Sequence, residues 1–124
     1  MKEQEIKAWA DLNRLLTEYV NVYYSRKNEE KWPEKEFATL KAAFEMYHSN
    51  NMITVSPQDM IKLKICLYGI EENPYNKLVQ DGAIADMKII FKKLSGESIV
   101  EKYQAQEDNQ KMNMIVKDGL NFRD

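Results

Sequence analysis

Histidine and cysteine, two residue types often used for catalysis and metal binding, each occur once in this chain, as His48 and Cys66. His48 ends a Glu45-x-x-His48 segment, a spacing that di-iron helical bundles use in two copies, and a single histidine cannot supply the second copy. Cys66 would need a neighbouring base to act as a nucleophile. We therefore expect no metal, no cofactor and no catalytic residue, with His48 near a helix end and Cys66 as a buried, inert thiol.

The remaining patterns typical of enzymes are also missing from the sequence. The chain has four glycines and contains no Cys-x-x-Cys pair, no Gly-x-Ser-x-Gly elbow and no Gly-x-x-x-x-Gly-Lys loop. Its 18 basic and 20 acidic residues leave a net charge of -2, which argues against bulk nucleic acid or an anionic membrane as the main partner. The sequence thus predicts a protein that is not an enzyme.

Residues 58–79 form the best candidate for binding DNA or RNA, which is the alternative function. Gly69 stands where a helix-turn-helix motif would turn, and a short helix could follow it. Glu71 and Glu72 argue against this hypothesis, because they would repel phosphates. The lysines that would contact nucleic acid are Lys62, Lys64, Lys88 and Lys92. An ordinary solvent-exposed helix surface explains them equally well.

Seven tyrosines and two tryptophans are more than a small core easily buries, because each buried hydroxyl requires a hydrogen-bond partner. Tyrosine and tryptophan are also enriched at protein interfaces. We expect at least one of Tyr19, Tyr23 and Tyr24 to be exposed and to contact another protein or a second copy. The function favoured by the sequence is non-catalytic protein–protein interaction by an accessory, adaptor or inhibitor protein. The excess of lysine over arginine indicates an AT-rich genome, either bacterial or phage, so we expect a bacterial protein or one encoded by a phage or mobile element.

The segment 2–27 is the strongest predicted helix. Its apolar residues, among them Trp9 and Leu16, cover roughly 200° of a helical wheel. This is about twice the apolar arc of an ordinary surface helix. We expect this helix to be central or shared with a partner. A second helix is predicted from Pro33 to about His48, with Phe37, Leu40, Phe44 and Tyr47 on one side.

The segment 60–68 fits both a helix and a strand. Ser56-Pro57-Gln58-Asp59 is typical of a helix start, whereas apolar residues alternate through Ile61, Leu63, Ile65 and Leu67. We favour a helix that ends at Gly69. Further helices are predicted over 84–94, ended by Ser95-Gly96, and over 97–106, with Asp81-Gly82 as a break.

Two short segments favour β-structure. Residues 52–55 are β-prone, and Asp118-Gly119 lies between short apolar runs, as in a tight hairpin of residues 112–122. The predicted fold is mainly α, a single domain over residues 1–124 with four to five helices, and the C-terminal hairpin gives an α+β alternative. No signal peptide or membrane span is expected, and one cysteine indicates no oxidising compartment, so the cytoplasm is the expected location.

Overall fold

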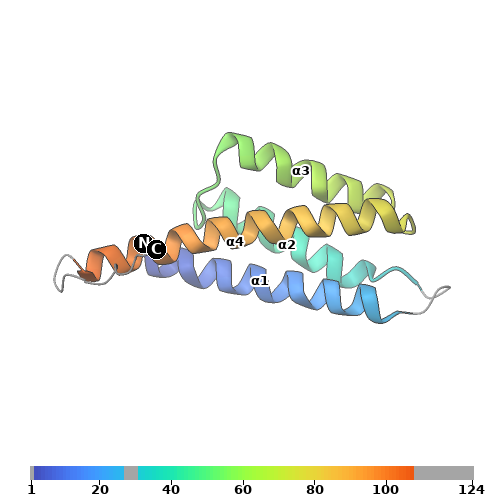
Figure 1. Ribbon diagram of the computed structural model, residues 1–124, viewed down its shortest axis with the longest axis horizontal. Coiled ribbons are helices and arrows are strands. Elements are labelled where there is room, and N and C mark those ends of the chain that lie inside the picture. Colours follow the sequence, from blue (N-terminus) through green and yellow to red (C-terminus); the bar gives the residue numbers. More distant parts are fainter. Residues whose placement is uncertain (1, 27–30, 108–124) are drawn as a thin grey trace, which may run out of the picture.

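Figure 1 shows a computed structural model of the chain, in which residues 2–26 and 31–107 are described. This part contains four helices and no strand: α1 (Lys2–Ser25), α2 (Glu34–Ser49), α3 (Pro57–Glu72) and α4 (Lys77–Glu107). The prediction of a small, mainly helical domain is confirmed. The hairpin predicted at residues 112–122 lies outside the described residues.

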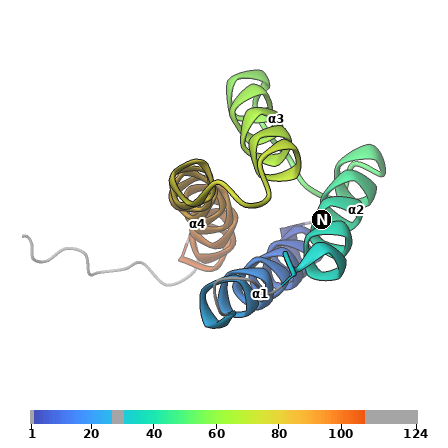
Figure 2. The same ribbon diagram turned by 90° about the vertical axis from the view of Figure 1, so that its right-hand side faces the viewer.

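The four helices form a bundle in which neighbours in sequence are neighbours in space. An end-on view places α3, α2, α1 and α4 in turn around a common centre (Figure 2). Helix α1 packs against both α2 and α4, while α3 packs mainly against α4. Helix α4 is the longest, and its C-terminal part extends past the N-terminal end of α1 (Figure 1).

The apolar arc of α1 forms the centre of the core. Trp9 and Leu16 are buried, as predicted, and so are Leu12 and Tyr19 on the same helix. The indole of Trp9 meets the ring of Phe91 edge-on, with the ring centroids 5.3 Å apart. The core therefore joins the first and last described helices directly, which explains why α1 requires so wide an apolar surface.

The segment 60–68 is helical, which resolves the helix-or-strand ambiguity. The backbone N–H of Asp59 donates to Oγ of Ser56 at 3.1 Å, the cap that the sequence predicted. The alternation arises because α3 carries apolar residues on two sides: Leu63 and Leu67 face the core, while Ile61 and Ile65 are exposed. The alternation of apolar residues in this segment therefore reflects a helix with apolar residues on two sides.

The predicted end of α3 at Gly69 is wrong, because the helix continues to Glu72. It stops at Asn73, whose backbone N–H and side-chain amide both donate to the Gly69 carbonyl, at 3.1 and 3.0 Å. A Cβ on Gly69 would lie 3.7 Å from Cγ1 of Val79, which is ordinary packing contact. Gly69 thus lies where α4 approaches α3 and does not mark a turn.

The breaks predicted at Asp81-Gly82 and Ser95-Gly96 are also wrong, since α4 runs through both. The two helices predicted over 84–94 and 97–106 are therefore parts of one helix. A glycine inside a helix costs only about 1 kcal/mol relative to alanine. Burial of Ile84, Met87 and Phe91 against the other helices outweighs that cost.

The β-prone segment 52–55 is part of the connection between α2 and α3 rather than a strand. Ile53 is buried in the core. The backbone N–H of Thr54 donates at 2.8 Å to the carboxylate of Glu5, a buried side chain of α1. This contact fixes the loop that positions the start of α3.

Candidate functional site

An exposed apolar surface lies along the outer side of α3 and α4. It consists of Ile61, Ile65 and Tyr68 on α3 with Ile89 on α4, and we name these four residues the α3–α4 face. The three α3 residues are spaced by four and three positions, so they lie on one side of the helix. Ile65, Tyr68 and Ile89 are 65%, 67% and 66% exposed. Large apolar side chains this open, gathered on adjacent helices, are candidates for a contact surface.

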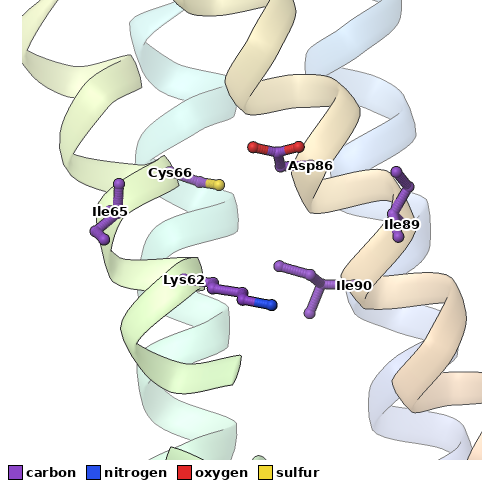
Figure 3. Close-up of a pocket in the computed structure, with 6 residues that line it drawn as sticks. All are labelled: Lys62, Ile65, Cys66, Asp86, Ile89 and Ile90. Atoms are coloured by element: carbon purple, nitrogen blue, oxygen red, sulfur yellow. The ribbon is translucent and has the colours of Figure 1, made fainter. Parts of the chain in front are cut away.

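A shallow pocket of about 320 Å³ separates the two helices at this face (Figure 3). Ile65 and Ile89 lie on its two flanks, and Cys66 and Ile90 project between the helices (Figure 3). Its six lining residues are Lys62, Ile65, Cys66, Asp86, Ile89 and Ile90. The pocket is therefore apolar, with one charge of each sign.

Cys66 is buried, as predicted, and its surroundings suppress its reactivity. Burial, and to a lesser extent the negative charge of Asp86, raise the pKa of the thiol to about 11. Because a nucleophilic cysteine reacts as the thiolate, Cys66 is protonated and unreactive at neutral pH. Its contribution to the pocket is apolar packing.

His48 lies in the last turn of α2, the position expected for it, and it is half-buried. Its ring lies nearly parallel to that of Phe44, with the centroids 6.2 Å apart. Among residues 2–26 and 31–107, no group of three or more histidine, cysteine, aspartate or glutamate side chains could hold a metal ion.

The three tyrosines proposed for partner binding have different environments. Tyr24 is 49% exposed, which confirms that at least one of them is open to solvent. Its hydroxyl donates to the carboxylate of Asp81. Tyr19 and Tyr23 are buried by the chain's own helices, at 0% and 4% exposure. The correction is that only Tyr24 of the three can belong to an exposed surface, and Tyr19 and Tyr23 are core residues.

A buried hydrogen-bond network accounts for Tyr19. The indole N–H of Trp32 donates to the Tyr19 hydroxyl at 2.7 Å, and this hydroxyl donates to Oε1 of Gln80 at 2.6 Å. The amide of Gln80 then donates to the backbone carbonyls of Ile70 and Asn73, both at 3.0 Å. Burial raises the pKa of Tyr19, so its hydroxyl stays protonated. The network joins α1 and α4 to the C-terminal end of α3.

Gln80 was missed by the sequence analysis, although a signal was present. It stands four positions before Ile84 and seven before Met87, so a polar residue interrupts the apolar side of α4. A buried polar side chain must be hydrogen-bonded, and such an interruption indicates a specific partner in the core.

The lysines proposed for nucleic-acid binding do not form one patch. Lys62 lines the pocket between α3 and α4, whereas Lys88 borders a separate pocket between α1 and α4. Lys64 and Lys92 are exposed as well. The turn expected at Gly69 is absent because α3 continues through it. The break between helices lies instead at residues 73–76, between α3 and α4, and the helix-turn-helix interpretation of residues 58–79 stays a prediction.

The α3–α4 face was not identified as a site by the sequence analysis. Its signal was the alternation of apolar residues over 61–68, which indicated strand periodicity but reflects a helix with apolar residues on both sides. Ile89 carried no separate signal, because it lies beside the buried Ile90 in the apolar pattern of α4.

Comparison of the chain with family models, curated proteins and solved structures gave no match. Among the helices within the described residues, none combines the length and apolar character needed to span a membrane.

Proposed function

We propose that this chain is a non-catalytic protein that binds another protein, or a second copy of itself, through the α3–α4 face. The proposal depends on the observation that α3 has apolar residues on two sides, one facing the core and the other facing solvent. Its inner residues Leu63, Leu67 and Ile70 are already buried in the core, so packing of the bundle gives no reason for Ile65 and Tyr68 to be apolar as well.

The composition of the face supports protein binding over other roles. Isoleucine and tyrosine bury large apolar areas, and tyrosine is enriched at the centres of interfaces. The pocket beside them offers an unreactive thiol and two charges of opposite sign. An accessory, adaptor or inhibitor protein working in the cytoplasm is the role that we favour. Nucleic-acid binding has less support, because Lys62 and Lys88 line two separate pockets, one between α3 and α4 and the other between α1 and α4.

The test immobilises the full chain, as the parent or as a variant, and exposes it to a lysate of its source organism supplemented with untagged copies of the chain. The proteins retained by the parent and by each variant are then compared. Ile65→Glu places a charge at the centre of the face and should abolish retention. Met46→Glu is the matched control, because Met46 is an exposed apolar residue on α2, away from the face. Both variants should keep the thermal stability of the parent.

Equal retention of the same proteins by the parent and by Ile65→Glu would contradict the proposal. Loss of retention with Met46→Glu but not with Ile65→Glu would move the binding surface to α2.

A further inference from the structure

The pocket on the α3–α4 face has opposite charges on its two walls. Lys62 projects from α3 and Asp86 from α4 (Figure 3). Neither forms an ion pair within the described part of the chain. Nearby charges are paired: Lys93 reaches the carboxylate of Asp59 at 3.1 Å. The α3–α4 face therefore presents two exposed charges of opposite sign beside its apolar residues.

Such an arrangement is complementary to itself. A two-fold symmetric contact uses the same patch on both copies, so every residue on one side of the patch meets one on the other side. If the axis runs along the pocket, parallel to the helices, α3 of one copy lies over α4 of the other. Lys62 of each copy then faces the α4 wall of the other copy, which carries Asp86, and Ile65 of each copy faces the wall that carries Ile89.

We propose that the α3–α4 face binds a second copy of this chain, forming a two-fold dimer with two Lys62–Asp86 ion pairs between the copies. This inference rests on the proposed function, since it names the partner of the same face. A second copy of the chain would cover the apolar residues of the face and pair with both of its charges. No separate partner with a complementary charge pattern is then needed.

The size of the face predicts the strength of the contact. Helix α3 has 16 residues and is about 24 Å long, and two packed helices present a width of about 19 Å. The projected area is roughly 450 Å², below the roughly 800 Å² per partner of a standard interface. We therefore expect a reversible dimer with a dissociation constant in the micromolar range rather than an obligate one.

The test is sedimentation velocity on the purified full chain over a range from low micromolar to several hundred micromolar. The parent should shift from monomer to dimer over this range. Lys62→Asp and Asp86→Lys should each weaken association at least about tenfold, because each places like charges opposite one another in both pairs. An equimolar mixture of the two variants should regain the dimer, because both cross-pairs are then attractive.

Ile65→Glu should weaken the dimer by about 30-fold or more, as expected for a central apolar residue, while Met46→Glu should leave it unchanged. A parent that stays monomeric throughout would overturn the dimer. If lysate proteins still bind in an Ile65-dependent way, the proposed function nevertheless stands. A parent dimer without recovery in the mixture would overturn the Lys62–Asp86 pairing and hence this geometry.

Discussion

Helices α1 and α3 both carry more apolar surface than an ordinary surface helix, but the other helices of the bundle cover much more of this surface on α1 than on α3. Most of the wide arc of α1 is covered, because α1 lies between α2 and α4, and only Val22 and Tyr24 near its C-terminal end are exposed. Helix α3 packs mainly against α4, so its outer residues Ile61, Ile65 and Tyr68 remain exposed. The apolar surface of a helix thus indicates how many neighbours it can pack against, while its place in the bundle determines whether the same chain supplies those neighbours.

The largest expected effect tests the covered side of this comparison. Trp9→Ala should lower the free energy of unfolding by about 3–5 kcal/mol, because a fully buried aromatic side chain would leave a cavity beside Phe91. Urea denaturation followed by circular dichroism measures the change. Val22→Ala, at a more exposed position of the same helix, is the control and should change stability little. A small effect of Trp9→Ala would mean that α1 is not the centre of the core.

A smaller effect is expected from the network that joins α1 to the end of α3. Tyr19→Phe removes the hydroxyl that Trp32 and Gln80 share, so the buried Gln80 and the half-buried Trp32 each lose a hydrogen-bond partner. We expect a loss of about 1–3 kcal/mol in unfolding free energy, measured by urea denaturation. Tyr24→Phe, which removes an exposed hydroxyl bonded to Asp81, should cost less. Equal losses in the two variants would contradict the buried network.

The attachment of α3 to α4 should depend on pH through Asp59. The hydrogen bond from Lys93 is the main cause that lowers the pKa of this carboxyl below its usual value of 3.8. Because the pKa is lower in the folded state, the contact stabilises the fold fully above the unfolded-state value and loses its effect as the pH falls through the folded-state value.

We therefore expect the urea midpoint of the parent to fall between about pH 5 and pH 2. Asp59→Asn should show a shallower fall, and Glu72→Gln, an exposed control, should retain the parental slope. Identical pH profiles for the parent and Asp59→Asn would show that this ion pair does not hold α3 in place.

The smallest effect on the unfolding free energy is expected for the exposed apolar side of α3. Ile65→Ala should change the unfolding free energy by no more than about 0.5 kcal/mol, measured at a protein concentration below the proposed dimerisation range. A slight gain is consistent with the higher helix propensity of alanine. A loss of several kcal/mol under these conditions would show that Ile65 belongs to the core, and the contrast between α1 and α3 would disappear.

Much of the fold followed from local patterns. The amphipathic periodicity of residues 2–27 predicted α1 and the burial of Trp9 and Leu16, and the Ser56-Pro57 start predicted the beginning of α3. The end of α3 and the continuity of α4 through its two glycines were not predictable in this way. Glycine lowers helix propensity by about 1 kcal/mol, and a long helix packed against two neighbours recovers more than that through burial.

The candidate site was harder to predict than the fold, because exposure is not a local property. Tyr19 and Tyr24 lie five residues apart on the same helix, yet one is fully buried and the other is half exposed. The first faces Trp32 and Gln80, which lie 13 and 61 positions further along the chain. No window of sequence around either tyrosine contains these partners.

The sequence by itself determined which segments are helical and how much apolar surface each one carries, because periodicity and capping depend on residues within one or two turns. Only the tertiary structure decided which apolar surfaces are covered. Coverage depends on which helices become neighbours, and that choice is made by contacts between residues distant in the chain, such as Trp9 with Phe91 and Tyr19 with Gln80. Ile65 and Leu63 are similar in type and two positions apart, but only Leu63 faces another helix of the chain.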